Sequence, residues 1–293
     1  MGANASSISA SSAAAAETNG TLFIPPLKPK LSDIPEACVA SVLSYLDPPE
    51  ICNLARLNRA FRDASSADFI WISKLPSNYP FLLKLLLIQD DQEEPFTPLA
   101  KRDVFALLSK PHSFDSGSKE VWIDKRTGGV CLSISWKAMT ITGIDDRRKE
   151  MLIFVVLEGD SNNLLETEKF QTIAYLQQIW WLEVVGDFEF QFPAGKYSLF
   201  FRLQLGRATK RLGRRVCTSD NMHGWDIKPV QFHFTTSDGQ HATTRCVLDT
   251  LGSWVHYHVG DFIVEDSNAS MRERAQIFVI DSEQAPGNRI VVA

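Results

Sequence analysis

The sequence has little cysteine, and its cysteines lack the spacing of a zinc site or a disulfide framework. There are five in 293 residues, an odd number, and none belongs to a Cys-x-x-Cys pair. His256 and His258 have no cysteine near them, whereas a structural zinc site needs about four clustered ligands. We therefore expect free thiols in a reducing compartment, cytoplasm and nucleus, with no metal and no cofactor.

Long apolar runs and an excess of basic residues are also missing. The longest aliphatic and aromatic run, residues 151–157, is far too short to cross a bilayer. A net charge of −5 argues against general attraction to nucleic acid or to anionic membranes. We expect no transmembrane segment and no nucleic-acid partner.

Several sequence motifs of enzymes are absent. The chain has no Gly-Lys-Ser/Thr phosphate loop, no Gly-x-Ser-x-Gly elbow and no His-Glu-x-x-His. Spacing alone leaves open a carboxylate pair of glycosidase type among the 35 acidic residues. One basic cluster is interpreted as a solvated loop, with a nuclear-localisation or anion-binding loop as the alternative: Arg207, Lys210, Arg211, Arg214 and Arg215. We predict a non-catalytic protein without catalytic residues.

The N-terminal segment is rich in alanine and serine. Residues 1–30 cannot bury enough apolar surface to become ordered, so we predict a disordered tail. Gly2, with Ser6 after it, fits the N-myristoylation pattern, and the alternative is a plain unmodified tail.

A pattern of short amphipathic helices follows, ending near Trp71. Asp33, with Glu36 three residues later, predicts the start of the first helix, because a side-chain acceptor and then an acid favour this end. Asp47 and Pro48 predict the start of the second. One apolar stripe is expected on the first helix: Val39, Val42, Leu43 and Leu46. Helices this short share their apolar faces with the rest of the chain or with a second polypeptide.

The order and spacing of these residues resemble the F-box family. The residues that carry the resemblance are Leu31-Ser-Asp-Ile34-Pro35-Glu36, Leu43-x-x-Leu46-Asp-Pro48, Leu54, Leu57, Phe61 and Trp71. The resemblance covers residues 31–76. It implies a three-helix module that docks on a Skp-type adaptor and, through it, on the cullin scaffold of a ubiquitin ligase. By that analogy the adaptor-facing residues are Ile34, Pro35, Leu43, Leu46, Pro48, Leu54 and Leu57.

Beyond a predicted helical bridge at residues 77–118, the apolar period changes from helical to alternating. Residues 197–205 alternate apolar and polar side chains, with Phe200 as the exception, and residues 188–192 and 254–259 alternate as well. Turn signals divide residues 119–293 into about eight to ten strands. The predicted fold class is therefore α+β, with a three-helix N-terminal module and an antiparallel β-sandwich or jelly roll.

The β-rich region resembles the phloem protein two lectins of plants, the Nictaba-like family. The blocks that carry the resemblance begin at Val121-Trp122-Ile123, Ala138-Met139-Thr140, Gln178-Ile179-Trp180, Tyr197-Ser-Leu and Gly224-Trp225-Asp226. The resemblance implies a binding domain, and a glycoprotein or protein target carrying N-glycans or N-acetylglucosamine oligomers. The two tryptophans of sugar-binding members align with Gly143 and Glu150, neither of which can stack on a sugar. Trp136 lies too early in the chain and is interpreted as a core residue.

Two functions follow as hypotheses from these two resemblances. The first is the substrate-recognition subunit of a Skp-cullin-F-box ubiquitin ligase. The alternative is a stand-alone carbohydrate-binding defence protein in which the helices only support folding.

Overall fold

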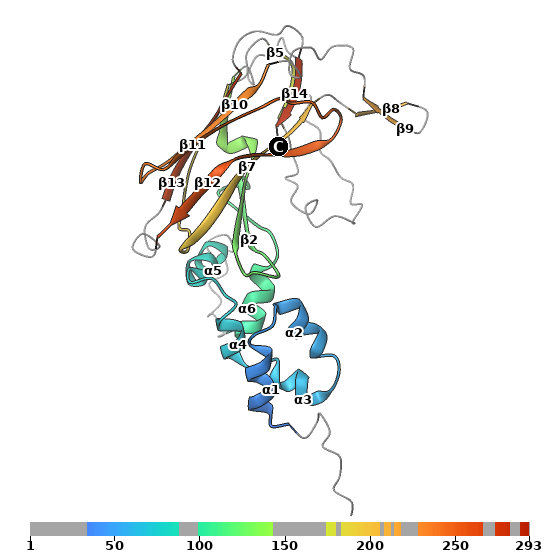
Figure 1. Ribbon diagram of the computed structural model, residues 1–293, viewed down its shortest axis with the longest axis vertical. Helices are drawn as coiled ribbons and strands as arrows, with labels where there is room; N and C mark the ends of the chain where they lie inside the picture. The colour runs from blue at the N-terminus through green and yellow to red at the C-terminus, as the bar shows by residue number, and fades with distance from the viewer. Residues whose placement is uncertain are drawn as a thin grey trace, which may run out of the picture.

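The computed structural model describes residues 34–87, 99–142, 174–179, 183–205, 208–211, 214–217, 228–265, 273–281 and 288–292. Figure 1 shows an elongated molecule, with helices at one end and β-sheets at the other. Helix α6 and strand β2 lie between them. The predicted α+β class and the two kinds of module are confirmed.

Four short helices form the N-terminal end: α1 Glu36–Leu43, α2 Pro48–Leu54, α3 Arg59–Ala64 and α4 Asp68–Ile72. Helix α2 begins where the sequence predicts, and the backbone N–H of Asp47 donates to Glu50 Oε2 at 3.1 Å. The N-cap of α1 is Pro35, which supplies no side-chain acceptor, so the predicted start at Asp33 is wrong. Asn58 caps α3, because its Oδ1 accepts from the N–H of Phe61 at 2.9 Å.

These helices share a small core that the rest of the chain completes. Trp71 is buried, its indole N–H donates to the carbonyl of Ser65 at 2.7 Å, and its ring packs against Phe105 with centroids 5.3 Å apart. The buried side chains of this end include Val39, Leu43, Ile51, Ile70 and Trp71. Within the predicted stripe on α1, Val39 and Leu43 are buried in this chain, whereas Val42 is exposed.

The predicted bridge contains helices α5 Tyr79–Leu87 and α6 Lys101–Leu108, as expected, and also a strand that was not. This strand, β1 His112–Phe114, pairs antiparallel with β2 Lys119–Ile123, and β2 pairs with β3 Val130–Ile134. The bridge is thus part helix and part sheet. Beyond the bridge, the turn between β2 and β3 touches the helical end at Gly128, which has φ +70° and lies so close to the carbonyl of Lys74 that an added Cβ would collide with its oxygen.

The β-sandwich has a five-stranded and a four-stranded sheet, in the strand orders β11-β10-β13-β6-β4 and β12-β7-β14-β5. Their bounds are β4 Met139–Ile141, β5 Ala174–Ile179, β6 Glu183–Phe190, β7 Gly195–Leu205, β10 Val230–Thr236, β11 His241–Cys246, β12 Trp254–Val264, β13 Glu273–Asp281 and β14 Asn288–Val292. All strand pairs within these two sheets are antiparallel.

Aromatic side chains from both sheets fill the space between them. Phe232 on β10 packs against Phe201 on β7 and stacks on Tyr257 of β12. Phe234 and Phe262 form a second contact across the sheets, with ring centroids 6.0 Å apart. The predicted alternation along β7 is confirmed, because Phe201, Leu203 and Leu205 are buried whereas Phe200 is exposed.

The sandwich and the helical end are joined by direct contacts. Asn78 Nδ2 donates to the carbonyl of Gln191 at 2.6 Å, and the ring of Phe81 on α5 meets Phe190 edge-on, with centroids 5.6 Å apart. The apolar core is continuous from Val39 to Val264. The two modules are thus packed on one another.

A separate hairpin carries four residues of the basic cluster, while Arg207 lies outside the described residues. Strands β8 Ala208–Arg211 and β9 Arg214–Cys217 pair antiparallel, with Lys210 opposite Arg215 and Arg211 opposite Arg214. The solvated loop predicted there is therefore a two-stranded ribbon. Figure 1 shows it extending away from the sandwich.

Some predictions fall outside the described residues, namely the tail 1–30 with Gly2, the strand at 151–157, and the positions Gly143 and Glu150. Within the described ranges, no helix is both long and apolar enough to span a membrane. Four cysteines of the described part form no disulfide: Cys38, Cys52, Cys131 and Cys246.

Candidate functional site

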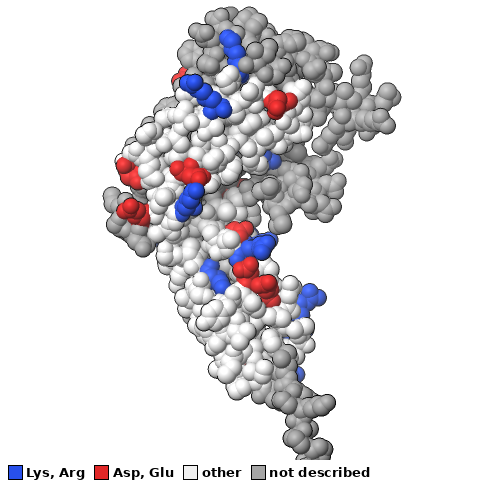
Figure 2. All heavy atoms as spheres, in the orientation of Figure 1, with Lys and Arg blue, Asp and Glu red and all other residues white. Residues whose placement is uncertain are grey.

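The helical end exposes large apolar side chains. Tyr45 is 89% exposed, Leu57 64% and Val42 62%. Cys38 and Val42 lie four residues apart on the outer face of α1, and Ile34 and Tyr45 continue this row beyond its two ends. We call Ile34, Cys38, Val42 and Tyr45 the α1 stripe. Figure 2 shows few charged side chains among the described residues at the lower end of the molecule.

The structure places the seven predicted adaptor-facing residues in three environments. Ile34, Pro35 and Leu57 are exposed, whereas Leu46 and Leu54 are half-buried against the core. Leu43 and Pro48 are buried within this chain. They hold α1 and α2 in place. Sequence reasoning missed Val42 as an exposed residue because periodicity alone does not say how wide the buried stripe is.

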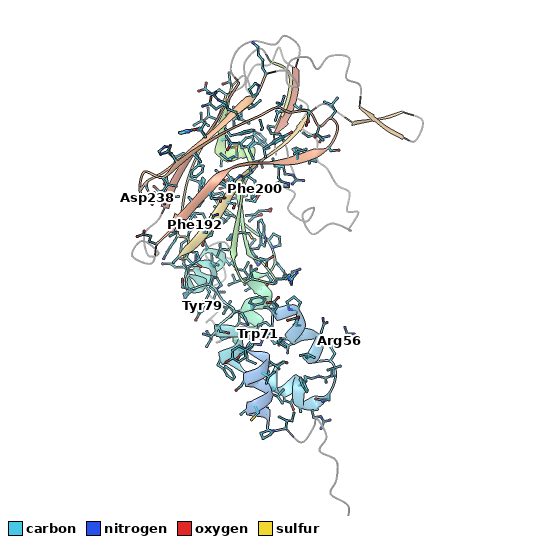
Figure 3. All side chains as sticks on the ribbon, viewed as in Figure 1. Arg56, Trp71, Tyr79, Phe192, Phe200 and Asp238 are labelled. Carbon is cyan, nitrogen blue, oxygen red and sulfur yellow. The ribbon has the colours of Figure 1, made fainter. Side chains whose placement is uncertain are left out.

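A cleft with a volume of about 740 Å³ lies where the hairpin β2–β3 meets β7. One side of the cleft is lined by the hairpin β2–β3, with Trp122 on β2 and residues of both faces of β3. The opposite face of β2, with Val121 and Ile123, is buried. The other wall is β7, including Phe200, whose position on the strand is labelled in Figure 3.

Tyr197 and Asp124, two polar residues that line the cleft, each have a defined protonation state. Burial raises the pKa of Tyr197 to about 12, so its hydroxyl stays protonated, and it donates to the carbonyl of Pro193 at 2.8 Å. Partial burial acts to raise the pKa of Asp124, but hydrogen bonds from Thr127 and Arg126 outweigh it and hold that pKa below its ordinary value. Asp124 is therefore ionised at neutral pH.

Beside the cleft, the outer face of β7 and β12 carries a network centred on Asp261. Its carboxylate accepts from Lys196 at 2.7 Å, from Ser198 at 2.8 Å and contacts His258 Nε2 at 2.8 Å. The bond to Lys196, followed by those from Ser198 and His258, holds the pKa of Asp261 far below its ordinary value. The ring of Phe200 lies against His258, with centroids 5.2 Å apart.

Two further polar residues, Arg202 on β7 and His256 on β12, line the cleft. Arg202 lies over the ring of Trp254, with its guanidinium carbon 5.1 Å from the centroid. His256 is opposite Arg202 in the strand register and also lines the cleft. Burial, and then the charge of Arg202, lower the pKa of His256, so this ring is neutral at neutral pH.

Sequence reasoning found part of this site. Trp136 is partly buried and packs against the core, in agreement with its predicted role. The cleft residues Trp122 and Phe200 were not predicted to bind anything. Phe200 carried a signal, because it breaks the alternation of its strand, but no pattern indicates that Trp122 lines the same cleft. In the part of the chain that the structure describes, no group of three or more metal-ligating side chains occurs.

Comparison with known proteins gives two family matches that divide the chain. The F-box-like model matches residues 31–75, and the Phloem protein 2 model matches residues 129–285. Two curated relatives come from Arabidopsis thaliana. F-box protein PP2-A13 is 53% identical, over 89% of this chain and 85% of its own length. F-box protein PP2-A12 is 52% identical, over 83% of this chain and 79% of its own length.

Among solved structures, TmCBM61 in complex with beta-1,4-galactotriose shows a distant likeness. The TM-score is 0.30 at 12% identity, and the match covers 54% of this chain and 86% of that one. A likeness at this level carries no argument about a ligand of this chain.

Proposed function

Because the chain belongs to the family of F-box proteins that carry a phloem protein 2 domain, we propose that it is the substrate-recognition subunit of a Skp-cullin-F-box ubiquitin ligase. Its helical end docks on a Skp-type adaptor, which links it to the cullin scaffold. Its β-sandwich selects a glycoprotein or protein target. The chain itself contributes binding and positioning.

The observation that carries this proposal is the exposed apolar surface of the helical end. Val42 on α1, Tyr45 in the turn after α1 and Leu57 in the turn after α2 are exposed, and α1, α2 and α4 are only five to eight residues long, too short to form a closed core alone. Contiguous exposed apolar side chains on a small module mark an interaction site. Burying one aliphatic side chain contributes roughly 1.5 to 3 kcal/mol, so a few of them suffice for a stable complex.

Rigid attachment of the sandwich supports the same role. The hydrogen bond from Asn78 to Gln191, the contact between Phe81 and Phe190, and the packing of Gly128 on Lys74 join the two modules. A target held by the sandwich therefore keeps a defined position relative to the docking helices. A receptor requires that geometry, whereas a stand-alone lectin does not.

The test is co-purification of the full chain with a plant Skp-type adaptor. We expect the unchanged chain to capture the adaptor. The affinity of the double variant Val42→Glu, Leu57→Glu for the adaptor should be lower by about 100-fold or more, because two apolar side chains that the adaptor covers become charged. Both side chains are exposed, so the thermal unfolding midpoint should stay close to that of the unchanged protein.

The matched control is Ile263→Glu, an equally exposed aliphatic side chain on β12 of the sandwich. It introduces the same charge and should leave adaptor capture unchanged. Failure of the unchanged chain to capture any Skp-type adaptor would refute the receptor role and favour the stand-alone lectin.

A further inference from the structure

We propose that one edge of strand β7 binds an extended segment of the target protein, which joins the four-stranded sheet as a further strand. Such binding states how the sandwich holds a protein target. It rests on the proposed function only for the identity of that target.

Strand β7 has neighbours on both sides for only part of its length. On one side, β12 pairs with it from Gly195 to Gln204. On the other side, β14 pairs only with Leu203, Gln204 and Leu205. Among the residues that the structure describes, no strand pairs with this second side of residues 195–201, which we call the β7 edge. A strand edge presents a row of backbone N–H and C=O groups that can pair with another chain.

The cleft described above lies along the β7 edge. Every residue from 195 to 201 lines it, from the inner as well as the outer face of the sheet. Lining by one face alone would indicate a cleft above the sheet, whereas lining by both faces indicates a cleft beside the strand. The cleft is therefore placed where a strand in line with β14 would lie.

Burial along the inner face of β7 changes where β14 stops. Leu203 and Leu205, which pair with β14 residues, are each 1% exposed. Tyr197 and Leu199, on the same inner face of the β7 edge, are only half-buried. A strand in the cleft would turn every second side chain towards these two residues and cover them. The core is thus less complete beside the β7 edge than beside β14.

The two faces of the β7 edge define the chemistry of the segment that fits there. On the inner face, Tyr197 and Leu199 favour apolar side chains at alternate positions of the segment. On the outer face, Ser198 already bonds to Asp261, and the 51% exposed ring of Phe200 is suited to an aromatic or β-branched neighbour across the strands. The segment is therefore about six residues long, alternately apolar, and free of proline, which lacks the N–H needed for pairing.

The shape of the cleft favours a single segment over a second copy of this chain. All of β3, Val130–Ile134, lines the cleft together with the β7 edge. One extended segment can enter between these two strands, whereas a second sandwich would bring a whole sheet behind its edge strand. Residues 73–77, which follow α4, also line the cleft, so a segment bound there is held close to the docking helices.

The test begins with phage-displayed peptides selected on the full chain. The tightest peptide is synthesised, each of its backbone amides is N-methylated in turn, and binding is measured by calorimetry. We expect affinity to fall about tenfold or more at alternate positions, whose N–H groups face β7, and to change little at the positions between them. Selection of no binding peptide, or losses without this alternation, would overturn the proposal.

One variant of the chain tests the place of binding. Phe200→Ala should weaken binding of the selected peptide about threefold, since it removes one side-chain contact across the strands. The matched control is Ile263→Ala, because Ile263 is 55% exposed on β12, on the side of β7 that is already paired. It should bind like the unchanged chain, and equal affinity of the two variants would place the peptide elsewhere.

Hydrogen–deuterium exchange at residue resolution tests the β7 edge before any peptide is added. We expect alternate amides of residues 195–201 to exchange fast in the free chain and slowly with the peptide, whereas residues 203–205 stay protected in both. Protection of every amide of residues 195–201 in the free chain would mean that this chain or a second copy already fills the cleft, and would contradict the proposal. Adaptor capture, measured on the same samples, tests the receptor role separately.

Discussion

The helical end and the β-sandwich differ in where they place their large apolar side chains. The sandwich places its aromatic side chains between two sheets, where Phe232 and Phe234 are fully buried. The helical end buries Leu43 and Ile51 but leaves Val42, Tyr45 and Leu57 in solvent. The core of the sandwich is formed between its own two sheets, whereas we propose that the exposed side chains of the helical end are covered by a second polypeptide.

The largest effect on stability is expected inside the sandwich. Phe232→Ala removes a ring that contacts Phe201 and Tyr257, and should lower the free energy of unfolding by about 3–5 kcal/mol. Phe200→Ala, on the exposed face of the neighbouring sheet, should change it by less than about 0.5 kcal/mol. Urea unfolding of both variants measures the contrast, and equal losses would contradict the assignment of inner and outer faces.

Two adjacent residues on α1 sharpen the comparison within the helical end. Leu43 is fully buried, so Leu43→Ala should cost about 2–5 kcal/mol of unfolding free energy. Val42→Ala should leave that free energy almost unchanged and weaken adaptor capture instead. Denaturation and co-purification of both variants separate the two roles. A destabilised Val42 variant would mean that the outer side of α1 packs within this chain.

A smaller effect is expected where the modules meet. Gly128→Ala forces an L-residue to φ +70° and brings its Cβ against the carbonyl of Lys74, so the hairpin must shift from the helices. We expect a loss of about 1–3 kcal/mol in unfolding free energy. Gly117 also has a positive φ but meets nothing near its Cβ, so Gly117→Ala is the control for backbone strain alone. Equal losses in both would remove the evidence for tight coupling at this turn.

The smallest effect concerns pH and the outer face of the sandwich. The pKa of Asp261 lies below its ordinary value of 3.8 in the folded protein, chiefly because of the bond to Lys196. The carboxylate therefore contributes stability above the unfolded-state pKa, and that contribution is lost as pH falls below about 3.8 towards the folded-state pKa. Asp261→Asn should be slightly less stable at neutral pH, and the difference should shrink below pH 4. Thermal unfolding at several pH values measures it, and a constant difference would contradict the role of the carboxylate.

The sequence predicted the order of the elements well, because helical and alternating periods report local structure. Caps such as Asn58 and the Asp47–Glu50 pair are local signals, and alternation identified the inward residues of β7. Strand β1 has only three residues, too few to show an alternating pattern, and the packing of Gly128 on Lys74 depends on contacts between distant segments. These could not be predicted, since no local pattern states which surfaces meet.

The same limit explains why the sequence pattern did not separate Val42 from Leu43 on α1. Val42 and Leu43 are both apolar and both fit the helical period, so the pattern placed them on one stripe. Only the packing of α1 on α3 and α4 decides that Leu43 turns inward and Val42 outward. Of the seven residues predicted to face the adaptor, Leu43 and Pro48 are buried within this chain, whereas Ile34, Pro35 and Leu57 are exposed.

The most direct test of the central claim is hydrogen–deuterium exchange of the full chain with and without a Skp-type adaptor. Covering the helical surface predicts slower exchange in residues 34–58 on adding the adaptor, with strands β7 and β12 unchanged. Unaltered exchange in residues 34–58, or protection confined to the sandwich, would contradict the claim that a second polypeptide completes this surface.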